Sequence, residues 1–299
     1  MFLLIGMSTP LNAGIYKWTD ENGKTHYSDK KPQINRFEDI EERINRMANA
    51  YSDSVTRQQE KLLENYEESI ELGTPNSTDL YFVSFAGDSK QRVFMREAIF
   101  TKNLFDQNYN TKDKSTALIN NSRTTEDYLV ASDENLEYVL KTMGDKMNDE
   151  DIIYLYLTSH GSKNHKLSVD FPPHTVKDFG GNEVRRMLDE AGIKWRIIVI
   201  SACYSGGFIE HLKTDHTLIA TASDAKNTSF GCSDEREFTY FGEAIYKRQM
   251  SQGVGINKSL QGADDIVSSM EKLHNYKSSN PQYWIGDKMQ SKIGELEET

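Results

Sequence analysis

The sequence predicts an α/β fold in which helices cover both faces of a mostly parallel central sheet. From residue 78 onwards, short apolar runs of strand length alternate with segments of helical spacing. Strands that are apolar at nearly every position are typical of parallel sheets, because such sheets are buried on both faces. The predicted strands are residues 80–85, 116–119, 152–157, 197–200 and 218–220.

The segments between these runs are predicted to be helices. Helical spacing of apolar residues starts near Arg92 and recurs over residues 132–143, 182–190 and 239–251. A helix between two parallel strands forms the crossover that such a sheet requires. We therefore expect one domain over residues 75–299, in which a layer of helices covers each face of the sheet.

The start of the chain predicts export. Residues 1–13 contain an apolar run from Phe2 to Met7 and end in Leu11-Asn12-Ala13, which resembles the core and cleavage site of a secretory signal peptide. A disordered or partly buried N-terminus is the alternative. No later stretch approaches the roughly 20 apolar residues that span a bilayer. The expected location is the bacterial periplasm or cell envelope.

Two further segments precede the predicted catalytic domain. Residues 14–35 form a small hairpin domain, because two aromatic-rich runs flank Asn22-Gly23, a pair suited to a type I′ turn. This segment resembles a small domain of uncharacterised function near the N-termini of bacterial envelope proteins. Residues 36–74 are rich in Glu, Arg, Gln and Leu and predict a long helical spacer. The segment from Gly73 to Ser77 marks the boundary.

Composition excludes one class of partner. The chain of 299 residues has 46 acidic and 35 basic residues and a formal net charge of −11. Binding to nucleic acid needs clustered Lys and Arg to neutralise phosphates, so no nucleic-acid partner is expected. The histidines and cysteines do not show metal-site spacing, and we expect neither a metal nor a cofactor.

Two predicted strands end in reactive residues. The strand at 152–157 leads into Thr158-Ser159-His160-Gly161, and the strand at 197–200 leads into Ala202-Cys203. Carboxyl ends of parallel strands meet at one sheet edge, so His160 and Cys203 should lie close together. An imidazole can take the proton of a thiol, which is a weak nucleophile until it is deprotonated. Gly161 lets the backbone approach a substrate carbonyl, and its N–H with that of Cys203 forms a candidate oxyanion hole.

Other interpretations of these residues stay open at this point. A single histidine or cysteine after a strand is often structural. Cys203 and Cys232 could instead form a disulfide in an exported protein. Ser205 would be a candidate nucleophile only if Cys203 were structural.

The blocks around His160 and Cys203 resemble the His-Gly and Ala-Cys blocks of the legumain family, in its bacterial branch. Further similarity follows at 220–224, 229–234 and 239–242. The resemblance implies a caspase-like three-layer fold, a cysteine endopeptidase and a peptide or protein substrate. It also implies a pocket for the residue before the cleaved bond, with Arg92 and Asp234 as charged members and Ser223 on its wall. The family has an acidic residue directly after the nucleophile, where this chain has Tyr204, so cleavage after asparagine does not carry over.

Three functions are therefore weighed. The favoured one is a cysteine endopeptidase, or a transpeptidase with the same acyl-enzyme intermediate. The alternative is a catalytically silent envelope module that binds a partner through a peptidase fold. A disulfide oxidoreductase lacks the Cys-x-x-Cys pair that it would need.

Overall fold

The computed structural model describes residues 15–33 and 38–298, so the predicted signal peptide at 1–13 lies outside the described residues. The chain divides into two compact units, Met1–Thr56 and Arg57–Thr299, and the division falls inside the long helix α1 (Ile40–Ser69). The predicted spacer at 36–74 thus contains one long helix. The domain boundary near residue 75 stays a prediction.

The first unit contains the predicted hairpin, but its turn differs from the prediction. Strands β1 (Tyr16–Thr19) and β2 (Thr25–Ser28) pair antiparallel, and β3 (Glu38–Asp39) pairs with the other edge of β1. Positive φ occurs at Gly23 (78°) but not at Asn22, so the type I′ turn was wrong. The reason is Asp20, whose Oδ1 accepts the N–H groups of Asn22 and Lys24 and so shapes a longer loop.

The second unit is built on a sheet that confirms the predicted fold class. Within the described residues this sheet has six strands in the order β11-β10-β9-β6-β4-β5, and all neighbouring pairs are parallel except β10 with β11. Its strands are β4 (Leu80–Ala86), β5 (Ser115–Ile119), β6 (Ile152–Thr158), β9 (Trp195–Ser201), β10 (Thr217–Thr221) and β11 (Gln282–Ile285). A separate two-stranded ladder joins β7 (Lys166–Leu167) and β8 (Phe179–Gly180).

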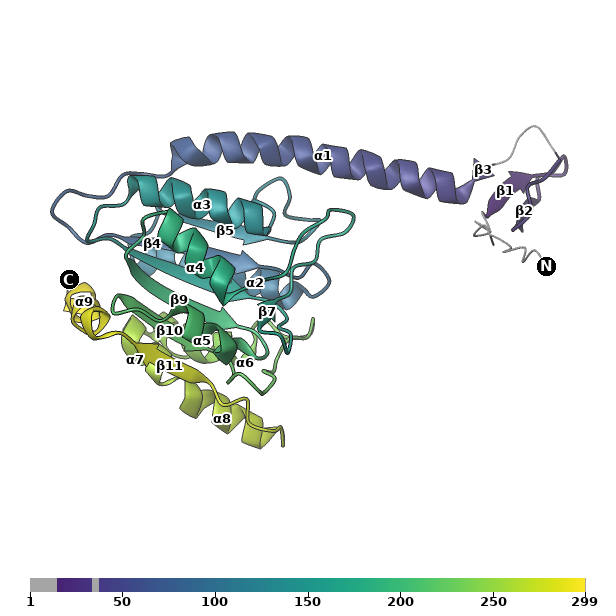
Figure 1. Cartoon of the computed structure of the whole chain (residues 1–299). Helices are drawn as coiled ribbons and strands as arrows, with labels where there is room; N and C mark the ends of the chain where they lie inside the picture. The colour runs from purple at the N-terminus through teal and green to yellow at the C-terminus, as the bar shows by residue number, and fades with distance from the viewer. Residues whose placement is uncertain (1–14, 34–37, 299) are drawn as a thin grey trace, which may run out of the picture. The chain divides into compact units, whose positions relative to one another are not determined.

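Helices cover both faces of the sheet, as Figure 1 shows. One apolar core packs α3 (Asp133–Lys146), α4 (Gly181–Glu190) and the last turns of α1 against the sheet face that carries Val83 and Leu155. The other core packs helices from later in the chain, together with part of α2, against the face that carries Phe82 and Tyr154. The remaining helices are α2 (Arg92–Asn108), α5 (Ile209–Leu212), α6 (Tyr240–Gly242), α7 (Ile256–Gln261), α8 (Ala263–Leu273) and α9 (Asp287–Glu298).

The C-terminal part of the chain differs most from expectation. Residues 239–251 do not form the regular helix that their spacing predicts, because α6 continues into a π-helical turn (Glu243–Lys247) and a 3₁₀ turn (Met250–Gln252). Strand β11 was not predicted. It is short, and its residues are only partly buried at the sheet edge, so it lacks the apolar run that marks the central strands.

Among residues 15–33 and 38–298, no helix combines the length and the apolar character that crossing a membrane would require.

Candidate active site

The register of the sheet places the two predicted catalytic residues after the ends of two neighbouring strands. Strands β6 and β9 are parallel neighbours, and Thr158 of β6 pairs with Ser201 of β9. His160 and Cys203 each follow two residues after these paired positions. Both side chains are partly exposed. The carboxyl end of the sheet therefore presents an imidazole and a thiol from adjacent strands.

The loop after His160 is in direct contact with the loop that carries Cys203, through a glycine. A Cβ atom at Gly161 would lie 1.9 Å from the carbonyl oxygen of Cys203 and 3.0 Å from its nitrogen. Only a residue without a side chain fits this approach. Within the described residues, neither the N–H of Gly161 nor that of Cys203 donates a hydrogen bond. Both N–H groups are available to a bound carbonyl.

The thiol of Cys203 is also in contact with a later loop, which carries Ser229. The backbone N–H of Ser229 donates to Cys203 Sγ at 3.3 Å. The Tyr204 N–H donates to the carbonyl of Asn227, and Tyr204 itself is left-handed with φ 58°. The sulfur also lies 3.7 Å from both the carbonyl oxygen and the hydroxyl oxygen of Ser229, so this residue contacts the thiol through its backbone and its side chain. Sequence reasoning did not single out Ser229, which stands within the similar segment 229–234.

The imidazole of His160 is packed but not hydrogen-bonded. Its ring contacts Phe94 of α2 edge to face, with the ring centroids 5.2 Å apart. The backbone carbonyl of His160 accepts the N–H of Ser168 at 2.8 Å, which fixes the loop. In the described part of the chain, no hydrogen bond reaches either ring nitrogen. Both nitrogens are therefore free for proton transfer, as is common before a substrate binds.

The structure brings together two of the predicted pocket residues, Arg92 and Asp234. The backbone N–H of Arg92 donates to Asp234 Oδ1 at 2.6 Å, and its Nε lies 3.6 Å from Oδ2. Arg96 reinforces the arrangement by donating to the carbonyl of Asp234 at 2.8 Å. The side chains of Arg92 and Asp234 are 46% and 44% exposed, so both remain able to contact a ligand.

Ser223, the third predicted pocket residue, is fully buried against the loop that carries Cys203. Its hydroxyl oxygen accepts the N–H of Ser205 at 3.2 Å, and its own N–H donates to the Ser205 hydroxyl at 3.2 Å. These reciprocal bonds fix the turn that follows Cys203. Ser205 is likewise fully buried, which leaves its hydroxyl inaccessible to a substrate. The assignment of Ser223 to the pocket wall stays a prediction.

The two cysteines, Cys203 and Cys232, are free thiols in this structure. Cys232 packs beside the small apolar cluster around Phe94. Burial raises the pKa of the Cys232 thiol, and the proximity of Cys203 raises it further. Cys232 is therefore held in its protonated, less nucleophilic form, while Cys203 has an N–H donor at its sulfur.

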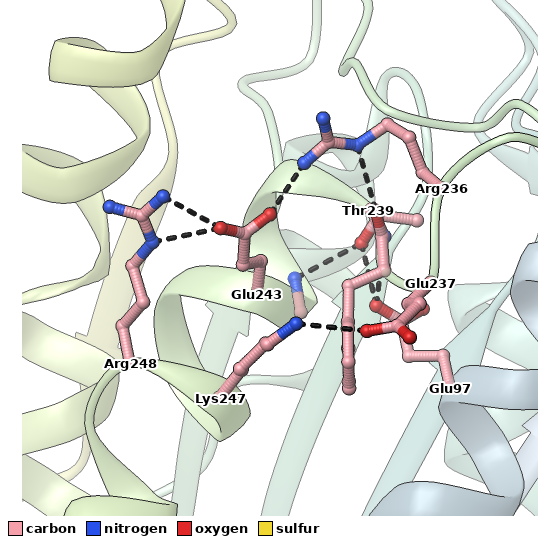
Figure 2. A network of polar contacts seen from close by, with 9 residues as sticks. Glu97, Arg236, Glu237, Thr239, Glu243, Lys247 and Arg248 are labelled. Carbon is pink, nitrogen blue, oxygen red and sulfur yellow. Dashed lines mark hydrogen bonds and ion pairs between the residues drawn. The ribbon is translucent and has the colours of Figure 1, made fainter.

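One buried acid that the sequence did not single out lies directly behind the site. Glu97 of α2 is fully buried, although it directly follows Arg96, which is partly exposed. Figure 2 shows Glu97 joined to Thr239 next to a second group in which Arg236 and Arg248 flank Glu243. The sequence offers no local signal for this burial.

The chain is similar to known proteins in sequence and in fold. The chain matches the model of the Peptidase C13 family over residues 131–291 and that of a domain of unknown function (DUF4124) over residues 2–46. No curated protein sequence matches it. Among solved structures it is similar to caspase-1 from Spodoptera frugiperda, with a TM-score of 0.49 and 11% identity, over 71% of this chain and 92% of that chain. The C13 match includes His160 and Cys203 and excludes Arg92.

Proposed function

Because this chain belongs to the Peptidase C13 family and is therefore of the cysteine peptidase kind, we propose that Cys203 is its nucleophile and His160 its general base. The observation that supports the assignment is the register of β6 and β9, which pairs Thr158 with Ser201, each two positions before one of the two residues. Gly161 packs against the backbone of Cys203, so the two strand-end loops are fixed relative to one another. The substrate is a peptide or a protein.

In the proposed mechanism, His160 accepts the thiol proton and the sulfur of Cys203 attacks the scissile carbonyl carbon. The N–H groups of Gly161 and Cys203 stabilise the negative oxygen of the tetrahedral intermediate. The carbon–nitrogen bond then breaks as the His160 imidazolium gives its proton to the departing amine. This leaves a thioester between Cys203 and the substrate. His160 next activates a water that hydrolyses the thioester and returns the free thiol.

Substrate selection in this proposal depends on the pair formed by Arg92 and Asp234. A guanidinium with a neighbouring carboxylate offers both hydrogen-bond donors and acceptors, which suits a polar side chain before the cleaved bond. The half-exposed state of both groups supports this role. Specificity for asparagine is not proposed, because Tyr204 occupies the position after the nucleophile.

We propose in addition that the protein is exported. The apolar run at the N-terminus and the match of residues 2–46 to the small N-terminal domain support this location. Fractionation of the source cells with an antibody to the protein tests it, and detection in the cytosolic fraction alone would count against export.

The peptidase proposal is tested by labelling the protein with a thiol-directed probe and by cleavage of a diverse peptide library. Wild type should be labelled at Cys203 and should cleave peptides, whereas Cys203→Ala should lose both properties. His160→Ala should retain the thiol but lose cleavage by about 100-fold or more. Cys232→Ala is the matched control, since it removes the other thiol and should leave cleavage unchanged. Cleavage that survives Cys203→Ala would refute the mechanism.

A further inference from the structure

Glu97 forms the centre of a buried hydrogen-bond network behind the two strand ends. Its side chain is 0% exposed, and its Oε2 accepts the hydroxyl of Thr158 at 2.8 Å. Its Oε1 accepts the hydroxyl of Thr239 at 2.9 Å and the Thr239 N–H at 3.2 Å. Three donors converge on one carboxyl group. Such a network is costly to leave incomplete, since each donor would then be buried without a partner.

The network extends to the strand that carries the nucleophile. The hydroxyl of Ser201 lies 2.9 Å from the hydroxyl of Thr239. Thr239 has a single hydroxyl hydrogen, which it donates to Glu97, so Ser201 is the donor in this contact. The N–H of Gly242 occupies the other acceptor position of Thr239 at 3.0 Å. Glu97 is therefore connected to β9 through one intermediate and to β6 directly.

Both attachment points lie immediately before the catalytic residues. Thr158 precedes His160 by two positions, and Ser201 precedes Cys203 by two positions. These two residues are also direct partners in the parallel register of β6 and β9. The Glu97 carboxyl thus fixes the two strands relative to each other at the last pair before the chains diverge into the active site.

The same helix brings a third part of the site into the network. Phe94 precedes Glu97 by three positions, so the two side chains lie on one face of α2. Phe94 contacts the imidazole of His160, and Arg92 at the start of α2 pairs with Asp234. Because Glu97 anchors α2, it also fixes the position of the Phe94 ring against His160 and that of the Arg92 guanidinium beside Asp234.

The surroundings of Glu97 leave no room for a substitute arrangement. A Cβ at Gly242 would lie 1.7 Å from Glu97 Oε1, so the glycine in the segment 239–242 is required by the carboxyl. The titratable groups that face Glu97 are the buried Tyr156 of β6 and, more weakly, Tyr246 of the π-helical turn. Burial raises the pKa of Glu97, and its polar neighbours, Tyr156 first and then Thr158 and Thr239, partly oppose this rise.

We propose that Glu97 is a positioning residue of the peptidase, which holds the β6 and β9 ends so that His160 and Cys203 meet in a reactive geometry. This inference rests on the proposed function, in which His160 activates Cys203. Glu97 does not touch the substrate, and it acts through Thr158, Thr239 and Ser201.

The test compares Glu97→Gln with wild type in two measurements. The first is the kinetics of peptide cleavage, and the second is the rate at which iodoacetamide alkylates Cys203 as a function of pH. Glu97→Gln keeps the shape of the side chain but replaces one acceptor oxygen with an amide NH₂ group. This group cannot accept a hydrogen bond from the donor that it faces. We expect kcat to fall by about tenfold or more and by a larger factor than KM rises, because misplaced reacting groups lose rate rather than affinity. The pH profile of alkylation should shift toward that of His160→Ala. In a His160→Ala background, Glu97→Gln should change the profile no further.

Thr101→Val is the matched control on the same helix. Thr101 is also 0% exposed, but its hydroxyl donates only to the carbonyl of Ala98 in its own helix. It should therefore lower stability without changing kcat or the alkylation profile. Should Glu97→Gln fail to fold, Thr158→Val carries the test, since it removes only the bond to β6 and should lower kcat in the same direction.

A folded Glu97→Gln or Thr158→Val with the kcat and alkylation profile of wild type would overturn the inference. An equal loss of kcat in Thr101→Val would also overturn it, because the effect would then be general destabilisation. Failure of the peptidase proposal shows separately, as cleavage that survives Cys203→Ala. In that event, the alkylation profile of Glu97→Gln still tests whether Glu97 positions His160 and Cys203, because alkylation needs no peptide substrate.

Discussion

Gly161 lies so close to Cys203 that a Cβ at position 161 would be 1.9 Å from the Cys203 carbonyl oxygen. The contact joins the loop after β6 to the loop after β9. The two proposed oxyanion donors, the N–H groups of Gly161 and Cys203, therefore belong to loops whose backbones are in direct contact, and this contact requires a glycine at position 161.

Gly161→Ala should therefore separate the two loops. We expect a loss of stability of about 1–3 kcal/mol, as for other side chains forced into filled space. We also expect kcat/KM to fall by about 100-fold, because the oxyanion donors move away from the reacting carbonyl. Peptide cleavage and urea unfolding measure the two effects.

Gly294→Ala provides the control for the glycine substitution. A Cβ at Gly294 in α9 would meet nothing within 4 Å. Alanine there should stabilise the helix by about 0.5–1 kcal/mol and leave cleavage unchanged. A Gly161→Ala enzyme with wild-type kcat/KM would contradict the role given to this glycine.

The central strands were predictable because their signal is local: each buried strand is a continuous apolar run. The pairing of β6 with β9 confirms that the strands before His160 and Cys203 are parallel neighbours, while the catalytic roles of the two residues stay predictions. The segment 239–251 was not predictable in its detail, because a π-helical turn has no distinctive residue pattern. Glu97 was missed for a different reason. Its partners Thr158 and Thr239 are 61 and 142 positions away, and only the tertiary fold buries it.

The pairing of Arg92 with Asp234 predicts a defect in substrate binding when the carboxylate is neutralised. Asp234→Asn should raise KM by about tenfold for substrates with a polar residue before the cleaved bond, with kcat changed less. Stability should change by less than about 1 kcal/mol, because the pair is half exposed. Steady-state kinetics and thermal unfolding of the same preparations provide the measurement.

A second exposed carboxylate serves as the control for Asp234. Glu210 pairs with Lys213 three positions along the chain and is 74% exposed. Glu210→Gln removes a charge of the same sign from the surface and should leave KM unchanged. An Asp234→Asn enzyme with the KM of Glu210→Gln would exclude Asp234 from the pocket.

The two thiols should differ in reactivity. Burial and the neighbouring Cys203 raise the pKa of the Cys232 thiol, so it is protonated at neutral pH. Both cysteines are partly exposed, and the Cys203 sulfur accepts the N–H of Ser229. We expect iodoacetamide to modify Cys232 at least about tenfold more slowly than Cys203. Peptide mapping by mass spectrometry over time measures both rates in one sample. Faster modification of Cys232 would show that burial does not control its reactivity.

Glu97 also predicts how stability depends on pH. Burial raises its pKa above the ordinary value of 4.5, so the folded protein binds the proton more tightly than the unfolded chain. The stability that this proton contributes is complete below pH 4.5 and is lost as pH rises through the raised value. Glu97→Gln does not titrate. The free energy of unfolding of wild type, taken relative to Glu97→Gln, should therefore fall as pH rises from 4.5 toward neutrality.

Glu237 supplies the control of opposite sign. Its hydrogen bond with Lys247 lowers its pKa, so its contribution is present above pH 4.5 and is lost as pH falls further. Because the Glu237 carboxylate is exposed, Glu237→Gln should change the pH dependence only slightly and in the opposite direction. Urea unfolding at several pH values, with wild type and both variants in parallel, separates the two cases. If wild type and Glu97→Gln keep a constant difference in unfolding free energy across this range, Glu97 does not titrate with the raised pKa that its burial implies.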